Sequence, residues 1–455
     1  MNTSKQKQLW FKLAMICALI LALQIPLLWV KGSMHERMRS QQEAAHDISQ
    51  SWSNAQNLTG PIIVVPYKVK SYEEVWDKNL DAYVTKERLS QKRAFIVPKS
   101  TQINGHATVE HRKRGIYSAP VYRTEITVKG EFDLQEYNQI KSSDKVGDIG
   151  KPFLVTLIGD LRGVSEIPEL QYADKTAVFT EGNRINVSTP GLNAPIDIDG
   201  LNAFEFSYHL NLKGSKTLGF FPLAKDNKVQ VSSEWPHPKF HGRFLPDRRE
   251  VSENGFNVTW NLNSLSSNVN SVIDACEIGD CNTLLTPSFG VDFIEPISAY
   301  SLSDRAGKYA LLFLLLTFAA FFMFEILKRL LIHPLQYLMV GLSLSVFYLL
   351  LTALSEHLAF ATAYWISALG CISLIGIYTS AVLAGKVRAL TLSSALLLIY
   401  GCIFVILNSE DFAFLMGALL IFSSLGALML MTRNVNWYQL GEQLAVKKEL
   451  DLQAS

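Results

Sequence analysis

The sequence predicts an α+β membrane protein with six transmembrane helices and a large, mainly antiparallel β domain, a sandwich or an open barrel, between the first two spans. Three observations lead to this fold class. Six apolar runs have the length of a membrane-spanning helix. Polar and apolar residues alternate in short segments within residues 31–308, as they do in half-buried strands. Basic residues gather on one side of the expected membrane helices.

The first apolar run, residues 13–30, follows a basic head, residues 1–12, that contains Lys5, Lys7 and Lys12. A cleaved signal peptide and an uncleaved anchor both begin in this way. The run is longer than a typical signal core and lacks an A-x-A cleavage site, which favours the anchor. The lysines before the run predict that the head stays in the cytoplasm.

Five further apolar runs predict the other transmembrane helices, at residues 309–327, 335–354, 358–384, 390–407 and 412–431. Basic residues follow alternate runs, at Lys328 and Arg329, at Lys386 and Arg388, and at Arg433 in the tail, residues 432–455. The short loops on the other side, residues 355–357 and 408–411, contain no Lys or Arg. The positive-inside rule therefore predicts that both termini are cytoplasmic and that the β domain is outside.

The β domain is predicted over residues 31–308. A helical period between Met34 and Trp52 indicates that the first helix continues to about Gln56 and is ended by Gly60-Pro61. After that point, short β-branched or alternating segments separated by turn residues predict strands at residues 62–67, 93–97, 121–132, 153–158, 204–212 and 255–262. Helices between these strands are not expected, which favours antiparallel pairing.

Composition and motifs narrow the classes of function. The net charge of +1, with no basic patch interleaved with aromatic residues, argues against nucleic-acid binding. The sequence contains no G-x-S-x-G, H-E-x-x-H or Walker A motif, so we expect neither catalysis nor a cofactor or metal. One alternative is an envelope enzyme whose site cannot be identified from the sequence. The other is a transporter or channel formed by the five C-terminal spans. Against it, these spans lack midplane charges and paired Gly or Pro breaks.

Glu325 is the acidic residue inside a predicted span, and such a residue is a functional candidate by default. Lys328 and Arg329 follow at i+3 and i+4, on the same helix face. The simplest interpretation is an interfacial ion pair of Glu325 with Lys328 and Arg329. A proton or ion relay is the alternative.

Asp304-Arg305 precedes the second span, and Glu356-His357 lies in the first short outer loop. Both positions are expected on the same side of the membrane as the β domain. They are therefore candidates for a joint between that domain and the helical bundle. The alternative is that these charged residues only set the depth of the helix ends.

Trp235-Pro236-His237-Pro238 predicts a rigid, exposed turn, which is a candidate docking surface. His237 and His241 are four residues apart, a spacing found in metal sites. The prolines make a helix there improbable, and no Asp or Glu completes a ligand set, so we do not expect a metal.

Cys276 and Cys281 enclose four residues. If the β domain lies in an oxidising compartment, these two cysteines are expected to form a disulfide. A redox site is the alternative, although redox pairs usually have the spacing C-x-x-C.

The chain resembles the CreD inner-membrane protein family of Gram-negative bacteria over nearly its whole length. The resemblance lies in long motifs: GPIIVVPY, RKRGIYSAPVY, SEWPHPKFHGRFLPDRREVSENGF, LSDRAGKYALLF, HPLQYLMVGLSLSVFYLLLTALSEH and TRNVNWY. It implies an inner-membrane protein linked to cell-envelope integrity. The family is associated with cell-envelope integrity, with tolerance to certain colicins and with a two-component stress response. It brings no known reaction.

We therefore expect a non-enzymatic inner-membrane protein that contributes to envelope integrity through its periplasmic domain. Its expected partners are the lipid bilayer and other envelope proteins or peptidoglycan-related components, and no nucleic acid.

Overall fold

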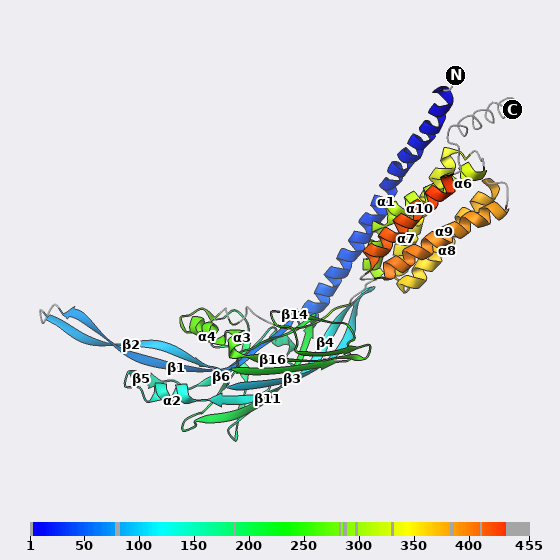
Figure 1. Cartoon of the computed structure of the whole chain (residues 1–455). Helices are drawn as coiled ribbons and strands as arrows, with labels where there is room; N and C mark the ends of the chain where they lie inside the picture. The colour runs from blue at the N-terminus through cyan, green and yellow to red at the C-terminus, as the bar shows by residue number, and fades with distance from the viewer. Residues whose placement is uncertain are drawn as a thin grey trace. The chain divides into compact units, whose positions relative to one another are not determined.

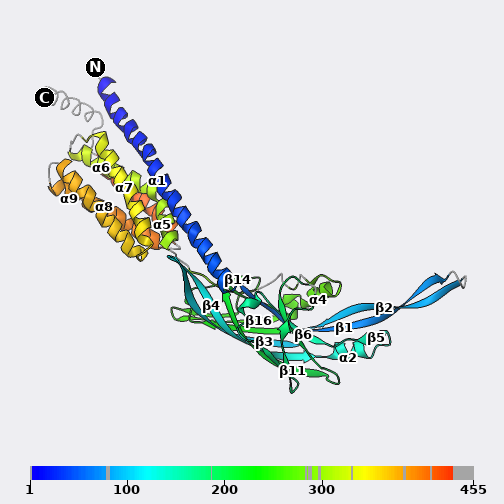
Figure 2. The same cartoon turned by 180° about the vertical axis from the view of Figure 1, so that it is seen from behind.

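The structure is a computed structural model that describes residues 3–77, 82–185, 187–281, 284, 289–295, 299–328, 332–382, 386–409 and 412–433. It divides into two compact units. Residues 43–296 form the first, here called the β-rich unit. Residues 1–42 and 297–455 form the second, the helical unit. Figures 1 and 2 show the two units from opposite sides. The fold is thus of the mixed α+β class, as predicted.

The β-rich unit contains two sheets. The first has nine strands: β1 Gln56–Asp77, β2 Ala82–Ile96, β5 Val146–Ile149, β6 Phe153–Ile158, β9 Thr180–Glu181, β10 Gly191–Pro195, β12 Thr217–Phe221, β14 Pro238–Gly242 and β17 Phe289–Phe293. Its strand order is β14-β17-β12-β1-β6-β10-β9, and β2 and β5 also pair with β1. Beyond the sheets, β1 and β2 continue as a long hairpin (Figure 1).

The second sheet has eight strands: β3 Ser100–Arg114, β4 Tyr117–Asp133, β7 Glu169–Tyr172, β8 Lys175–Val178, β11 Ala203–Ser215, β13 Asp226–Ser233, β15 Arg248–Ser252 and β16 Gly255–Asn263. Its order is β15-β16-β13-β3-β4-β11-β7-β8. The pairs β1 with β12 and β3 with β13 are parallel, and the other pairings among the described strands are antiparallel.

The two sheets share one hydrophobic core, which makes the unit a sandwich. Ile63 of β1 and Leu154 of β6 lie in the same cluster as Val128 of β4, Tyr208 of β11 and Val231 of β13. Strict alternation in β11 follows from this arrangement, because only one face of the eight-stranded sheet is buried.

The nine-stranded sheet is buried on both faces. Its second face, with Ile62 and Val155, packs against Val269 and Cys276 of α4. The short helices of the unit are α2 Gln135–Lys141, η1 Leu161–Gly163, α3 Ser264–Ser267 and α4 Val269–Glu277. Burial on both faces explains why residues 62–65 and 153–158 are continuous apolar runs rather than alternating ones.

The helices of the helical unit are the larger part of α1 Thr3–Trp52, α5 Ala299–Lys308, α6 Ala310–Lys328, α7 Pro334–Ser355, α8 Phe360–Val382, α9 Lys386–Asn408 and α10 Ala413–Thr432. Five described helices are long and apolar enough to cross a membrane, and the number rises to six if the bent pair α5–α6 counts as one span. The bend between α5 and α6 is 47°.

Aromatic rings fill the interior of the helical unit. The rings of Phe313 and Tyr400 have centroids 4.4 Å apart, and Phe347 lies 4.9 Å from Tyr400 and 5.5 Å from Tyr364. The Tyr364 hydroxyl donates to the Tyr400 carbonyl oxygen at 2.8 Å. The centre of the unit is therefore a packed core.

Two boundaries differ from those predicted. Residues 31–42 and 299–308, expected in the β domain, belong to the helical unit, because Met34 of α1 and Leu302 and Ala306 of α5 are buried in its core. Helix α1 ends at Trp52, and Gly60-Pro61 does not end it but lies within β1. Strand β1 starts at Gln56, where its pairing with β12 begins.

Candidate functional site

Helix α1 contacts the helical unit along one face. The buried apolar residues of this face recur at intervals of seven, four and seven: Ile16, Leu23, Leu27 and Met34. These intervals keep side chains on one side of a helix. Leu21, Leu28 and Trp29 are exposed on other faces. A lipid environment would accommodate them, since hydrocarbon chains are as apolar as these side chains.

Glu325 of α6 lies at one end of this contact face and is only 4% exposed. Its carboxylate forms an ion pair with Lys12 of α1. It also accepts hydrogen bonds from the Tyr337 hydroxyl at 2.8 Å and from the Ile332 backbone N–H at 3.1 Å. A buried carboxylate is costly unless it is paired and hydrogen-bonded, and three donors meet that need here.

These partners are not the expected residues. Lys12 lies far from Glu325 in the chain, Ile332 lies just before α7, and Tyr337 lies in α7. Arg329 and the side chain of Lys328 lie outside the described residues, so the ion pair predicted with them stays a prediction. The sequence places Lys12 in the basic head and gives it no partner. It lies 313 residues from Glu325, and no local pattern connects residues so far apart.

Two carboxylates lie at the other end of the α1 contact face. Asp304 of α5 is buried, and its Oδ1 lies 3.7 Å from Nε2 of His35, while its Oδ2 pairs with Lys308 at 2.9 Å. Glu356, which follows α7, pairs with Nε of Arg37 at 3.1 Å. Lys12 and His35 are 23 residues apart, about 35 Å along a helix, and this is close to the thickness of a bilayer's hydrocarbon core.

The four residues of the predicted joint therefore lie near α1 or on the surface. Asp304 and Glu356 contact α1. Arg305 is partly exposed and His357 exposed, and neither side chain has a polar partner among the described residues. The role of these residues as a joint to the β domain stays a prediction.

A glycine allows α1 to approach α7 closely. A Cβ atom on Gly341 would lie 2.1 Å from Cδ1 of Leu23. Any side chain at position 341 would thus displace Leu23, which is 1% exposed. The small residue and the terminal ion pairs together place α1 against the bundle, as expected for helix packing in lipid.

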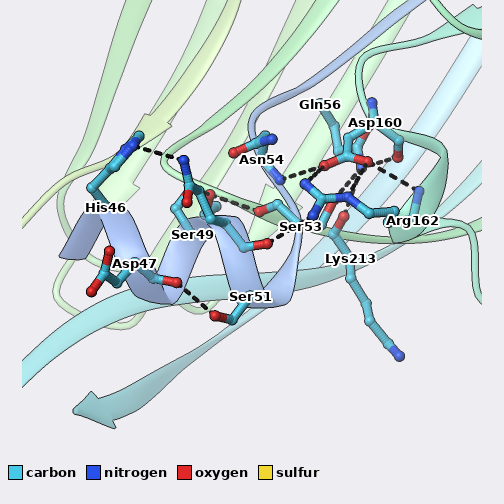
Figure 3. A network of polar contacts seen from close by, with 12 residues as sticks. His46, Asp47, Ser49, Ser51, Ser53, Asn54, Gln56, Asp160, Arg162 and Lys213 are labelled. Atoms are coloured by element: carbon cyan, nitrogen blue, oxygen red, sulfur yellow. Dashed lines mark hydrogen bonds and ion pairs between the residues drawn. The ribbon is translucent and has the colours of Figure 1, made fainter. Parts of the chain in front are cut away.

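The last turns of α1 lie in the β-rich unit, where a second polar network surrounds Gln56 (Figure 3). The Gln56 side chain is fully buried. Its amide nitrogen lies within 3.0 Å of Ser53 Oγ, the Asp160 carbonyl and the Lys213 carbonyl. Its amide oxygen accepts from the Asp160 backbone N–H at 3.1 Å. The Gln56 side chain thereby joins the end of α1 to the segment after β6 and to the last residues of β11.

Asp160 and Arg162 complete this network. Asp160 accepts from the Asn54 backbone N–H at 3.0 Å and from the Arg162 guanidinium at 2.6 and 3.0 Å. The guanidinium also donates to the Gln50 carbonyl at 2.9 Å, which satisfies a free carbonyl of the last helical turn. The hydrogen bonds from Arg162 are the main cause that lowers the pKa of Asp160 to about 2.

Trp52 ends α1 among three cations. The charged groups of Arg112, Arg123 and Lys213 lie 4.5, 4.9 and 5.4 Å from the centroid of its ring. A cation is attracted to the face of an indole ring and also to the C-terminal end of a helix, which carries a partial negative charge. The end of α1 is therefore held by charge as well as by hydrogen bonds.

Sequence reasoning assigned no role to Gln56, Asp160 or Arg162. Asp160 and Arg162 pair with each other two positions apart, but most other contacts of this network join positions about 100 or more apart, which no local pattern shows. The available signal was a polar stretch, Ser53 to Gln56, between a helical period and a β-branched run.

The remaining predicted residues lie elsewhere in the β-rich unit. Cys276 and Cys281 form a disulfide beneath the nine-stranded sheet. In the turn at residues 235–238, His237 is exposed, but Trp235, Pro236 and Pro238 are half-buried. The Trp235 indole N–H donates to the His237 carbonyl at 3.1 Å. The Trp235 side chain also packs against the hydrophobic core of the unit.

The two histidines of this region have separate surroundings. Nδ1 of His241 pairs with Asp292 at 3.2 Å, whereas His237 points to the surface. Within the described ranges, no group of three His, Cys, Asp or Glu residues could hold a metal ion.

Comparison with known proteins places these features in a family. The family model of "Inner membrane protein CreD" matches residues 8–438. "Inner membrane protein CreD" of Escherichia coli (strain K12) is 34% identical over 435 residues, which cover 94% of each chain. A solved M1 zinc metallopeptidase from Deinococcus radiodurans aligns with 35% of this chain and 38% of its own, with 9% identity and a TM-score of 0.18. That likeness is too low to carry an argument.

The Asp160 carboxylate predicts a pH dependence of stability. An unfolded aspartate titrates near pH 4, above the pKa of the folded residue. Its stabilisation is therefore fully present above about pH 4 and is lost as the pH falls toward about 2. We expect Asp160→Asn to lower the free energy of unfolding by about 1–3 kcal/mol at pH 7. At pH 2 only a small part of the difference from the wild type should remain.

The measurement is guanidinium unfolding of the full chain in lipid nanodiscs, followed by near-UV circular dichroism between pH 2 and 7. Asp148→Asn is the control, because Asp148 is exposed and pairs only at the surface with Lys68. A constant difference between Asp160→Asn and the wild type across this range would refute the assignment.

Proposed function

The chain belongs to the CreD family of inner membrane proteins, and from this premise we propose that it is a non-catalytic, six-span protein that supports envelope integrity. In this proposal the β-rich unit is periplasmic and both termini are cytoplasmic. The protein contributes to stress tolerance, including tolerance to colicins, as the family resemblance implies.

The contacts of α1 carry this proposal. Within the helical unit, Lys12 pairs with Glu325 at one end of the contact face. At the other end, His35 lies near Asp304 and Arg37 pairs with Glu356. Within the β-rich unit, its last turn is fixed by the Gln56 and Asp160 network. One helix thus belongs to both the membrane anchor and the domain that we place in the periplasm. This arrangement suits a protein that holds a domain at the membrane surface.

The direction of insertion is supported by the charge distribution. Lys386 and Arg388 begin α9 on the side that we assign to the cytoplasm, and Arg433 follows α10 on the same side. Glu356 and His357 lie on the opposite side. Six spans result when α5 and α6 count as one bent span. An even number of spans keeps both termini on one side.

A binding or scaffolding role fits the interior of the helical unit better than a conducting role. The rings of Phe313, Phe347, Tyr364 and Tyr400 pack against one another at its centre. Such a packed core supports the non-transporting interpretation.

The topology is tested by fusions of alkaline phosphatase, which is active only outside the cytoplasm. We expect activity for fusions after residues 150 and 409, because both would be periplasmic. A fusion after residue 387 should be inactive, and fusion levels are compared by immunoblotting. The reverse pattern would overturn the proposed orientation.

The function is tested by deleting the gene for this chain from its host bacterium. The deletion strain should release more of a periplasmic marker enzyme and should become more sensitive to colicins, and the wild-type chain should reverse both changes. The paired control measures uptake of small solutes and ions. Normal envelope retention combined with a specific uptake defect would favour a transporter and contradict the proposal.

A further inference from the structure

The outer face of the eight-stranded sheet is open and polar. The second face of the nine-stranded sheet is covered by α4. On the eight-stranded sheet, in contrast, the outward side chains at one level of four strands are all polar: Gln102 of β3, Lys129 of β4, Ser207 of β11 and Lys228 of β13. An open hollow of about 1190 Å³ lies over these strands. We call it the sheet hollow.

A row of amide, hydroxyl and lysine side chains crosses the sheet hollow. Strand register places six residues side by side on successive strands: Asn261, Lys228, Gln102, Lys129, Ser207 and Gln171. At a strand spacing of about 4.8 Å, the row is about 24 Å long. Lys129 and Lys228 stand two strands apart, and neither has an ion-pair or hydrogen-bond partner in the described part of the chain. We call these six residues the basic row.

An acidic row runs parallel to the basic row, two residues further along each strand. It contains Asn263, Asp226, Ser100, Glu131 and Glu205. Two residues along a strand correspond to about 7 Å. Glu131 and Glu205 stand directly opposite each other, although like charges in this position destabilise a sheet.

Only part of this acidic charge is neutralised. Lys99 pairs with Glu131 at 3.1 Å, but Asp226 and Glu205 have no cationic partner among the residues described. Unpaired lysines and unpaired carboxylates therefore lie in separate rows, about 7 Å apart, where each remains available to a ligand.

The two rows define the chemistry of a complementary ligand. Carboxylates of the ligand would face Lys129 and Lys228, and its ammonium groups would face Asp226 and Glu205. Hydroxyl and amide groups would pair with the amide side chains between them. The acidic row would repel nucleic acid. The apolar residues that line the hollow are buried or half-buried, which leaves little apolar surface for a lipid tail: Tyr172, Ala173, Phe206 and Leu262. The ligand is thus a long polar polymer that carries both kinds of charge.

We propose that the sheet hollow binds peptidoglycan, a glycan chain with hydroxyl and amide groups whose short peptides carry free carboxylates and amines. The inference rests on the proposed function, because it requires the β-rich unit to face the periplasm. It assigns the carboxylates of the peptides to the basic row and their amines to the acidic row.

The test uses the full chain in lipid nanodiscs and purified sacculi, measured by co-sedimentation. Lys129→Glu with Lys228→Glu should weaken retention by about tenfold or more, because two charge-assisted hydrogen bonds are lost. The matched control is Lys113→Glu with Lys239→Glu. It makes the same change of charge at two exposed lysines outside the hollow and should bind as the wild type does.

Two treatments of the sacculi separate the sources of binding. An amidase hydrolyses the amide between muramic acid and peptide and releases soluble glycan strands that keep carboxylates but lack amines, so these strands should compete with intact sacculi more weakly than peptide-bearing fragments do. Acetylation of the free amines should weaken retention of the wild type, but not of Glu205→Lys with Asp226→Lys, which lacks the proposed partners of those amines. Soluble peptide fragments should compete with the sacculi.

Unfolding midpoints of all variants are measured first. Since the changed side chains are exposed, we expect midpoints close to the wild-type value, except that Glu205→Lys with Asp226→Lys removes the repulsion between Glu131 and Glu205 and should raise the midpoint slightly. Absence of retention by the folded wild-type chain would overturn the inference, as would equal retention of the hollow variants and the control. Neither of these two results would contradict the proposed function, which is tested separately by the phenotype of the deletion strain. Retention without a deletion phenotype would instead contradict the proposed function.

Discussion

The ion pair between Lys12 and the buried Glu325 is the interaction on which the arrangement of the helical unit depends. A carboxylate that is 4% exposed between apolar helices requires a cation and hydrogen-bond donors. Lys12 supplies the cation, while Tyr337 and Ile332 supply the hydrogen bonds. Because α1 buries few apolar residues, and apolar contacts gain little over lipid contacts in a bilayer, these polar contacts set the position of the helix.

The same helix is fixed again at its other end. His35 and Arg37 face Asp304 and Glu356 about one hydrocarbon thickness from Lys12. Further along, the buried amide of Gln56 and the carboxylate of Asp160 hold the last turn within the β-rich unit (Figure 3). Each unit therefore has its own attachment to α1, which explains how one helix can serve both.

Local patterns in the sequence predicted most of the secondary structure. The helices α7 to α10 lie where apolar runs indicated spans, and β11 lies where alternation indicated a strand with one buried face. The family was also recognised from motifs, and the comparisons confirm it. These features are predictable because periodicity and span length are local properties of the chain.

The partners of the polar residues could not be predicted in the same way. Glu325 has Lys328 and Arg329 at helical spacing, yet the contacts described for it come from Lys12 and from the start of α7. Likewise, residues 299–308 resemble a polar domain edge but form α5, whose buried Leu302 packs with the helices. Such pairings depend on which elements meet in space, and a single sequence contains no signal for that.

The most direct test of this account is a double-mutant cycle on Lys12 and Glu325 in the full chain, reconstituted in lipid. Lys12→Met and Glu325→Leu should each lower the free energy of unfolding by about 3–5 kcal/mol, because each leaves the partner charge uncompensated. The double variant should lose much less than the sum, and Lys386→Met, at an exposed lysine of α9, should have little effect. Additive losses would contradict the claim that this pair places α1.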